Sequence, residues 1–216
     1  MTKAVIFDMD GIVFDTEPIG FEATKKLLKK YGKYIKYKEI ILYLGTGVRN
    51  YVESIAKKKK VNEDIEILIK KRKKYFVELA KNKLRVFPGI IKLIKELRKN
   101  KVKTALATSS SIKSVKLNCK LTKLNIKLFN VIVTRNDITK FKPDPEIFNI
   151  AIKKLKVKPE DCIVIEDSIA GIKAAQKAKT KVIAISNSLP KSKLKTAKLV
   201  FNSAEDIKFR KLMSLF

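Results

Sequence analysis

The chain has 216 residues, with 50 lysine and arginine residues against 21 aspartate and glutamate residues, and a formal net charge of +29. Hydrophobic residues make up 45% of it, with only 7 glycines and 6 prolines, which excludes a disordered or collagen-like chain and allows one sizeable core. Histidine is absent, so Ser-His-Asp and Cys-His hydrolases and His-ligated zinc sites are also excluded.

The first predicted element is a buried strand at residues 3–7, which ends at the acidic segment Asp8-Met9-Asp10-Gly11. Residues 16–84 are predicted to be helical, because apolar side chains recur there at helical spacing, for example at Phe21, Leu28, Leu68 and Phe76. Residues 44–49 form a turn between helices. The pattern predicts a helical insertion directly after the first strand.

Strands and helices alternate along the rest of the chain. Strands are predicted at residues 102–107, 131–134, 162–165 and 181–185, helices at 90–100, 112–124, 145–155 and 169–178, and a last strand-helix pair across 199–212. This alternation predicts an α/β fold with a doubly wound, mainly parallel sheet. We expect a core of residues 1–15 and 85–216 and an inserted α-helical cap domain of residues 16–84.

Polar side chains follow the predicted strands where each strand ends. Ligands of parallel sheets bind outside the carboxyl ends of the strands, so these side chains should meet at one edge. They are Asp8 and Asp10, Thr108-Ser109-Ser110, Lys142, and Glu166-Asp167-Ser168. Carboxylates this close repel by about 4 kcal/mol per pair at 4 Å for an effective dielectric near 20. A hard divalent cation relieves that repulsion, and oxygen ligands favour Mg²⁺.

These residues, in this order, resemble the four motifs of the haloacid dehalogenase (HAD) superfamily. The motifs are Phe7-Asp8-Met9-Asp10-Gly11, Thr108 at a strand end, Lys142-Pro143 and Glu166-Asp167. The resemblance covers nearly the whole chain, and the insertion is similar to the cap of the subgroup that holds β-phosphoglucomutase and the phosphorylated-carbohydrate phosphatases. It implies a HAD-like Rossmannoid core and an Mg²⁺-dependent phosphatase of small phosphomonoesters such as sugar phosphates.

The resemblance also implies a role for each motif residue. Asp8 attacks phosphorus to form an aspartyl-phosphate, and Asp10 serves as general acid and then as general base. Thr108, the Ser109 amide and Lys142 hold the non-bridging phosphate oxygens. The expected Mg²⁺ ligands are Asp8, Asp10 through its backbone carbonyl, Asp167 and Glu166.

Some of these residues have an alternative, purely structural interpretation. Thr108 could cap the helix that follows it, which is compatible with phosphate binding. Lys142 could be one more solvated surface lysine. Glu166 could accept hydrogen bonds from neighbouring loops and leave the metal to Asp167.

Within the family, the second acidic residue, Asp10, favours phosphoryl chemistry, because dehalogenases do not need it. Mutases of the subgroup carry a histidine where this chain has Gly20 and tend to have an amide where it has Ile112. We therefore interpret the chain as a phosphatase, with a β-phosphoglucomutase-like phosphosugar mutase as the alternative. Arg49 and Lys73 resemble substrate-clamping positions of the cap and are expected to grip the distal part of the substrate, although both could be exposed helix charges.

The positive charge is spread along the whole chain, which is typical of solvated helix faces. A basic nucleic-acid-binding protein with a decayed HAD site is the alternative from a different class. Cys119 and Cys162 form no C-x-x-C pair, and no apolar run of 18 residues occurs. We expect a cytoplasmic monomer whose partner is a small phosphorylated metabolite, with no membrane and no specific nucleic acid as partners.

Overall fold

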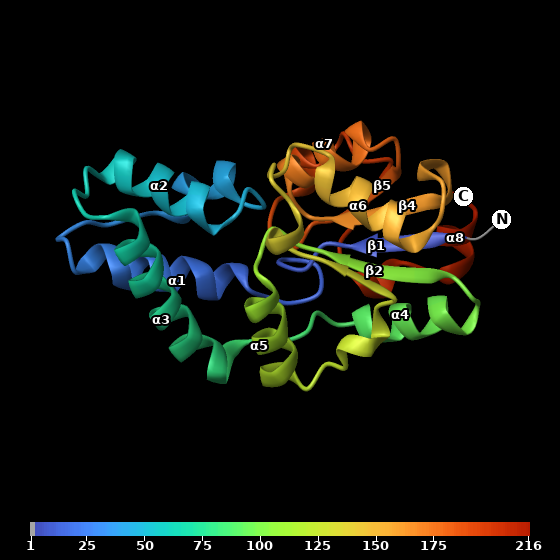
Figure 1. Ribbon diagram of the computed structural model, residues 1–216, viewed down its shortest axis with the longest axis horizontal. Coiled ribbons are helices and arrows are strands. Elements are labelled where there is room, and N and C mark those ends of the chain that lie inside the picture. The colour runs from blue at the N-terminus through green and yellow to red at the C-terminus, as the bar shows by residue number, and fades with distance from the viewer. Residues whose placement is uncertain (1–2) are drawn as a thin grey trace.

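The computed structural model describes residues 3–216 and contains a six-stranded parallel sheet (Figure 1). The strands are β1 (Ala4–Phe7), β2 (Lys103–Ala107), β3 (Val131–Val133), β4 (Cys162–Glu166), β5 (Lys181–Ile185) and β6 (Leu199–Phe201). Their order is β3-β2-β1-β4-β5-β6, so the chain winds outward in both directions from β1. The doubly wound parallel sheet expected from the sequence is confirmed. The order reverses between β1 and β4, where such sheets bind their ligands.

Helices cover both faces of this sheet. On one face lie α6 (Glu146–Leu155) and α7 (Ile169–Lys177), and on the other lie α4 (Ile90–Lys99), α5 (Ile112–Thr122) and α8 (Phe209–Met213) (Figure 1). Two of these helices begin at a serine cap. Ser111 Oγ accepts a hydrogen bond from Ser114 N, and Ser168 Oγ accepts one from Gly171 N. Both caps follow a strand end, so they fix the loops at the carboxyl edge of the sheet.

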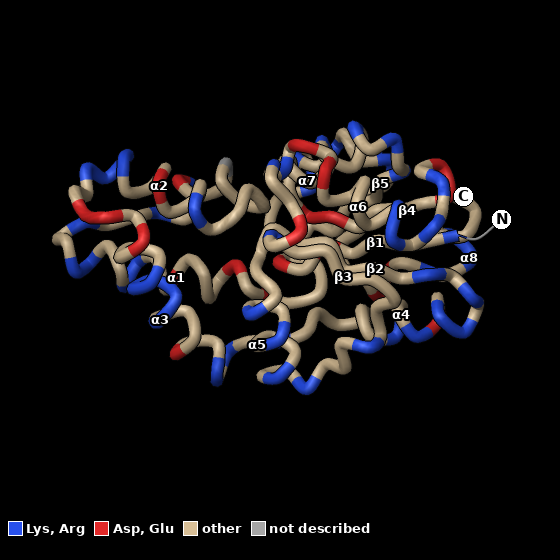
Figure 2. The backbone as a smooth tube through the Cα atoms, in the orientation of Figure 1, with Lys and Arg blue, Asp and Glu red and all other residues tan. Residues whose placement is uncertain are grey.

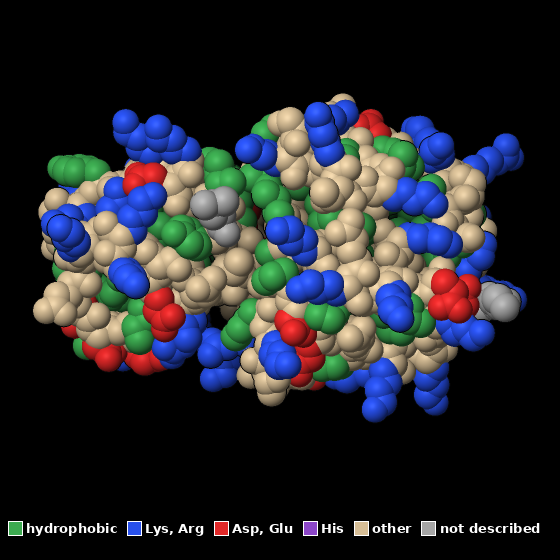
Figure 3. Space-filling view, turned by 90° about the horizontal axis from the view of Figure 1, so that it is seen from above, with side chains coloured by type: hydrophobic (Ala, Val, Ile, Leu, Met, Phe, Trp, Pro, Cys, Tyr) green, Lys and Arg blue, Asp and Glu red, His purple; other side chains and the backbone are tan. Residues whose placement is uncertain are grey.

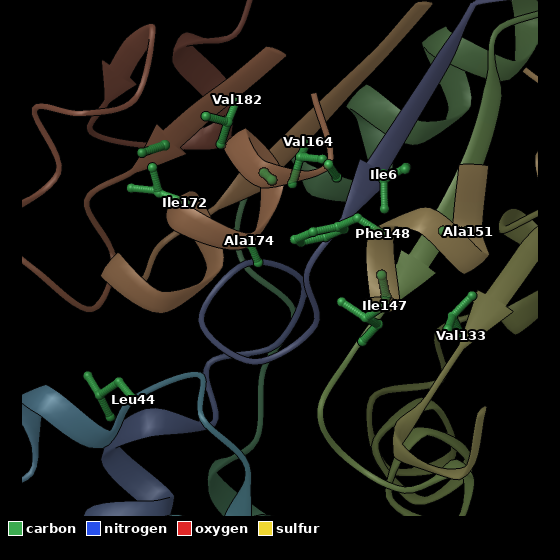
Figure 4. Close-up of a cluster of buried hydrophobic side chains, with 14 of the residues drawn as sticks. Ile6, Leu44, Val133, Ile147, Phe148, Ala151, Val164, Ile172, Ala174 and Val182 are labelled. Atoms are coloured by element: carbon green, nitrogen blue, oxygen red, sulfur yellow. The ribbon is translucent and has the colours of Figure 1, made fainter. Parts of the chain in front are cut away.

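Alternate residues of β1 enter two hydrophobic clusters on opposite faces of the sheet. Ala4 and Ile6 belong to the cluster beneath α6 and α7, whereas Val5 and Phe7 belong to the cluster beneath α4 and α5. All four side chains are fully buried, as expected for a central parallel strand. Figure 4 shows Ile6 close to Phe148 of α6 within the first cluster. This packing on both faces holds the loop after β1 in a fixed position.

The segment between β1 and α4 folds as a helical lobe beside the sheet (Figure 1). It contains α1 (Glu17–Lys29), α2 (Val48–Lys59) and α3 (Ile65–Lys83), with two short 3-10 helices, η1 (Tyr37–Glu39) and η2 (Ile41–Tyr43), between α1 and α2. α2 is followed by Lys60, its C-cap, which adopts a left-handed conformation. α3 is preceded by Asp64, its N-cap, whose Oδ1 accepts hydrogen bonds from two backbone amides. The helical character is confirmed, while the domain limits at 15/16 and 84/85 stay a prediction.

The face of the molecule in Figure 3 is rich in positive charge. On the face shown in Figure 3, lysine and arginine side chains are scattered over both lobes and are interspersed with acidic groups. Several of the lysines form surface ion pairs, such as Lys25 with Glu22 and Lys154 with Asp137. Within residues 3–216, no helix combines the length and the apolar character needed to cross a membrane.

The burial pattern of α4 generates a first prediction. Leu97 is fully buried against the sheet, so Leu97→Ala should lower the free energy of unfolding by about 2–5 kcal/mol through lost apolar contact and a residual cavity. Lys95→Ala, an exposed site on the same helix, should change it by no more than about 0.5 kcal/mol. Urea unfolding of both variants measures the difference, and equal losses would contradict the packing described for α4.

Candidate active site

The predicted site residues meet at the carboxyl edge of the central strands. Asp8 directly follows β1, and its backbone amide continues the ladder by donating to Ile165 O of β4 at 3.0 Å. Thr108 directly follows β2, and its amide donates to Val133 O of β3 at 2.9 Å. Glu166 is the last residue of β4. Figure 2 shows acidic positions gathered where these strands end, next to the helical lobe. The sheet therefore brings these motifs, far apart in the sequence, to one edge.

Lys142 lies between two carboxylates at this edge. Its Nζ donates to Asp8 Oδ1 and, at 2.6 Å, to Glu166 Oε1. The side chains of Lys142 and Glu166 are fully buried, and that of Asp8 is nearly so. Burial lowers the pKa of Lys142, but the two carboxylates outweigh it and hold that pKa above its usual range. Lys142 is therefore an ammonium ion in the site rather than a solvated surface lysine.

Glu166 uses both of its carboxylate oxygens within the protein. Oε1 accepts from Lys142, while Oε2 accepts from the backbone amides of Asp167 and Ser168 at 2.9 and 3.0 Å and from Ser168 Oγ at 2.9 Å. Gly171 makes room for this carboxylate, because a Cβ there would lie 1.8 Å from Oε1. Glu166 thus positions Lys142 and the start of α7 in this structure.

Asp10 is held by hydroxyl groups. Its Oδ1 accepts from Thr16 Oγ1 at 2.8 Å, and its Oδ2 accepts from Ser110 Oγ at 2.8 Å and from Thr108 Oγ1 at 3.3 Å. Thr16 directly precedes α1 of the helical lobe, whereas Thr108 and Ser110 belong to the loop after β2. Asp10 therefore joins the loop after β1 to the phosphate-binding loop proposed from the sequence and to the base of the cap.

Asp167 faces the loops after β1 and β5. Ser188 Oγ donates to Asp167 Oδ2, and a Cβ on Gly11 would lie 1.8 Å from that same oxygen. Gly11 also has a φ of +85°, which glycine adopts without strain. The carboxylate of Asp167 thus reaches the β1 loop only because residue 11 has no side chain.

The pKa values of Asp8 and Asp167 are both raised by the surroundings of these side chains. Burial raises the pKa of Asp8 well above its usual range, Lys142 lowers it, and the Glu166 and Asp10 carboxylates raise it again. Burial likewise raises the pKa of Asp167, and the Glu166 and Asp8 carboxylates raise it further. A cation placed between Asp8 and Asp167 would favour the ionised form of both.

The carboxylate oxygens at this edge of the sheet are of the kind that Mg²⁺ binds in proteins. Within residues 3–216, no three Asp, Glu, Cys or His side chains are arranged to hold a metal ion by themselves. Mg²⁺ usually takes one or two carboxylates and keeps its remaining positions for water and substrate phosphate. Asp8 and Asp167 would supply two such carboxylates, and Asp10, in the loop after β1, would supply its backbone carbonyl. These residues are compatible with the magnesium site expected from the sequence.

A cavity of about 250 Å³ lies between the cap and this edge of the sheet. Its lining includes Asp8, Asp10 and Ser109 from the core and Lys73 from α3. Arg49 is not among the lining residues, and its guanidinium forms ion pairs with Glu53 and Glu66 on the cap surface. The structure brings Lys73 to the cavity and leaves Arg49 outside it.

The sequence analysis misses Ser188 and the polar contacts of Arg72. Arg72 of α3 lines the cavity, and its Nε and Nη2 donate to Thr24 Oγ1 at 2.9 Å and to Gly20 O at 3.0 Å. Ser188 follows β5, so the rule that finds Asp8 after β1 could have found it too. Arg72 belongs to the segment Lys71-Arg72-Lys73, which resembles a substrate clamp in the sequence, but its polar partners depend on the packing of α3 on α1.

Comparisons with known proteins agree with this geometry. The family model described as haloacid dehalogenase-like hydrolase matches residues 5–185. The chain is 33% identical over 182 residues to a phosphorylated carbohydrates phosphatase of Thermotoga maritima, covering 82% of this chain and 81% of that protein. It is 34% identical over 183 residues to the β-phosphoglucomutase of Bacillus subtilis, with 82% and 80% covered. The chain belongs to the haloacid dehalogenase-like hydrolase family.

The solved structures support the same assignment. The crystal structure of a HAD hydrolase, family IA, variant 3, from Entamoeba histolytica matches with a TM-score of 0.85 and 26% identity, covering 99% of both chains. Because several relatives are named phosphatases, the chain is an enzyme of the phosphoric monoester hydrolase class. Two relatives from Arabidopsis thaliana are longer, and the chain spans 19% and 56% of their lengths.

The contact between Gly11 and Asp167 generates a prediction with a matched control. Gly32 also has a positive φ, of +66°, but a Cβ there meets nothing within 4 Å. Gly32→Ala should therefore cost only the strain of a left-handed residue, about 1–2 kcal/mol. Gly11→Ala should cost a further ~1–3 kcal/mol, because the new methyl group must displace the Asp167 carboxylate. Urea unfolding of both variants checks this, and equal losses would mean that Asp167 does not press on Gly11.

Proposed function

We propose that the chain is an Mg²⁺-dependent phosphatase that hydrolyses small phosphomonoesters, in particular sugar phosphates, through an aspartyl-phosphate on Asp8. The observation that carries the proposal is the position of Asp8. Its carboxylate lies at the carboxyl end of the central strand, beside the buried ammonium of Lys142 and at the wall of the cavity. A carboxylate in this position is a suitable nucleophile for a phosphate that enters from the cavity.

In the first step, an oxygen of the Asp8 carboxylate attacks phosphorus, and the bond from phosphorus to the ester oxygen of the substrate breaks. Asp10 in its acid form gives its proton to the leaving alkoxide. Asp10 lies two residues from Asp8 and lines the same cavity, and its hydrogen bond from Thr16 connects it to the start of the cap. A change in the position of the cap would thus alter the orientation of the general acid.

In the second step, Asp10, now a carboxylate, takes a proton from a water molecule as that water attacks phosphorus. The bond to Asp8 breaks, inorganic phosphate leaves and both aspartates return to their starting forms. Splitting the reaction into two displacements replaces one difficult step by two easier ones. A cap closed over the cavity would exclude bulk water during this step.

The non-bridging phosphate oxygens need donors where negative charge spreads during transfer. Lys142 is already held against Asp8, so its ammonium is pre-positioned at the reacting atoms. Thr108 and Ser109 belong to the loop after β2, which would supply further donors. Ser109 Oγ donates to Gly45 O of the cap at 3.1 Å. That bond links the phosphate-binding loop to the cap as well.

Mg²⁺ would be held by the carboxylates of Asp8 and Asp167 and by the backbone carbonyl of Asp10. When bound, the ion neutralises charge so that an anionic nucleophile and an anionic phosphate approach each other. Glu166 is the fourth ligand expected from the sequence. Its four hydrogen bonds support its alternative role, in which it orients Lys142 and the start of α7 and contacts the metal only indirectly.

The size of the cavity and the names of the relatives support sugar phosphates as the substrate class. A volume of about 250 Å³ is just below the range of ~300–1,000 Å³ that is usual for drug-sized ligands, so it suits a small metabolite. A relative is named a phosphorylated carbohydrates phosphatase. Lys73 lines the cavity and can grip the distal part of such a substrate, while Arg49 would have to leave Glu53 and Glu66 to do so.

A phosphosugar mutase is the competing function, since a β-phosphoglucomutase is among the relatives. The surroundings of Gly20 favour the phosphatase. A Cβ on Gly20 would lie 2.9 Å from Arg72 Nη2, which donates to Gly20 O. A side chain at position 20 would meet the end of Arg72, and the chain has no histidine with which to line the cavity.

The proposed reaction predicts the effect of removing the nucleophile. With Mg²⁺, the wild-type protein should release inorganic phosphate from members of a sugar-phosphate panel, and Asp8→Asn should reduce this by at least about 10³-fold, because the amide is a far weaker nucleophile. Removing Mg²⁺ with a chelator should abolish release, and adding it back should restore it. Asp161→Asn, an acidic residue outside the cavity lining that directly precedes β4, is the matched control and should retain full activity. Full activity in Asp8→Asn would contradict the proposal.

A second measurement separates the phosphatase from the mutase. When β-glucose 1-phosphate is supplied with Mg²⁺, the phosphatase should yield glucose and inorganic phosphate in equal amounts. Formation of glucose 6-phosphate without net phosphate release would establish the mutase instead. Phosphorus NMR distinguishes inorganic phosphate from glucose 6-phosphate in one sample.

A further inference from the structure

The loop after β5 carries none of the motif residues, although β5 ends at the same edge of the parallel sheet as β1 and β4. Two neighbouring residues of this loop nevertheless reach the candidate metal site. Asn187 Nδ2 donates to Gly11 O at 2.8 Å, and Ser188 Oγ donates to Asp167 Oδ2. In the strand order, β4 lies between β5 and β1, so the loop must pass over the end of β4 to reach Gly11.

The carboxylate of Asp167 is enclosed between Ser188 and Gly11. A Cβ on Gly11 would lie 1.8 Å from Asp167 Oδ2 and 2.6 Å from Ser188 Oγ, so the three groups meet at one point. Within residues 3–216, Ser188 Oγ is the one hydrogen-bond donor to this carboxylate, and it takes Oδ2. Oδ1 has no partner in these residues and is not fully buried, so a cation can reach it.

Asn187 fixes the backbone beside another expected Mg²⁺ ligand, the carbonyl of Asp10. The peptide group that contains this carbonyl also contains the amide of Gly11, which donates to Phe14 O at 2.9 Å. The next peptide group contains the Gly11 carbonyl, which accepts from Asn187. Because peptide groups are planar, fixing both of them fixes the direction in which the Asp10 carbonyl points.

The loop after β5 is itself held in place. Ile185, the last residue of β5, is fully buried, and Leu189, which follows Ser188, is buried in the hydrophobic cluster beneath α6 and α7. Ser186 N and Ser186 Oγ both donate to Phe201 O of β6, at 2.9 and 3.2 Å. A side chain can orient a metal ligand only if its own position is fixed, and this loop meets that condition.

We propose that Ser188 and Asn187 are positioning residues of the magnesium site. Ser188 holds Asp167 by Oδ2 and leaves Oδ1 for the ion, and Asn187 holds the loop after β1 so that the Asp10 carbonyl keeps its direction. Both act through a ligand of the ion. Removing partners that orient metal ligands typically costs about 10–100-fold in metal affinity. The inference rests on the proposed function, because it concerns the Mg²⁺ that this function requires.

The test of Ser188 measures Mg²⁺ binding without catalysis, from the shift in urea unfolding that Mg²⁺ causes at constant ionic strength. Each variant is compared with itself in chelator, so a change in basal stability cancels. Ser188→Ala should raise the dissociation constant for Mg²⁺ about tenfold, which lowers the stabilisation by about 1.4 kcal/mol when Mg²⁺ is well above that constant. Ser186→Ala removes a hydroxyl from the same loop and is the matched control, so it should keep the wild-type shift.

Asn187 is tested in the same way and by steady-state kinetics. Asn187→Ala should also raise the dissociation constant for Mg²⁺, because the loop after β1 loses its bond at Gly11 O. Asn202→Ala, an exposed asparagine directly after β6, is its matched control and should keep the wild-type shift. Asn187→Ala and Ser188→Ala should need about tenfold more Mg²⁺ for half-maximal rate and retain kcat at saturating Mg²⁺ within about threefold. A purely structural role would instead lower stability in chelator and leave the Mg²⁺ shift unchanged.

The outcomes separate this inference from the function on which it rests. If the wild type releases phosphate with Mg²⁺ but Ser188→Ala or Asn187→Ala keeps the wild-type Mg²⁺ shift, that residue is not a positioning residue and the phosphatase stands. Asp167→Asn removes a proposed ligand and should lose most of the shift. If Mg²⁺ stabilises Asp167→Asn as strongly as wild type, the proposed magnesium site fails. If no sugar phosphate yields phosphate with Mg²⁺, the proposed function itself fails.

Discussion

The Lys142 ammonium, enclosed between the carboxylates of Asp8 and Glu166, is the charge on which the arrangement of the site depends. All three groups are buried, and removing any one would leave a buried charge without its partner. Glu166 is tied by its other oxygen to the backbone at the start of α7. The lysine therefore joins the ends of β1 and β4 to the segment before α6, and it fixes where Asp8 faces the cavity.

The other carboxylates divide according to the partners that the fold gives them. Glu166 is neutralised by the lysine and by amides, and Asp10 is satisfied by three hydroxyl groups. Asp8 and Asp167 keep pKa values well above their usual range because burial and neighbouring carboxylates disfavour their ionised forms. A bound cation would favour the ionised forms of Asp8 and Asp167, so the four acidic side chains at this edge need not play the same role.

Much of the fold could be predicted from the sequence, because buried parallel strands have strong apolar runs and their carboxyl ends must meet at one edge. The expected strand at 102–107 and the observed β2 (Lys103–Ala107) differ by one residue. The ends of helices were harder to predict from the sequence, because backbone conformation sets them. α5 ends at Thr122 rather than at the expected residue 124, because Lys123 is left-handed. The ion pairs of Arg49 and the hydrogen bonds of Arg72 depend on how α1, α2 and α3 pack, which periodicity does not encode.

The residues that could be predicted and those that could not lie on different parts of this fold. Asp8, Thr108 and Asp167 directly follow a strand, so topology alone brings them together, and Ser188 and Arg135 lie close behind β5 and β3. Asn118 belongs to a helix face, where a polar residue gives no signal until the cavity beside it is known. Relatives of 32–34% identity are named for different substrates. The strand-end motif residues of this chain are placed by topology, whereas residues on helix faces that line the cavity depend on helix packing, so the second set can vary without moving the first.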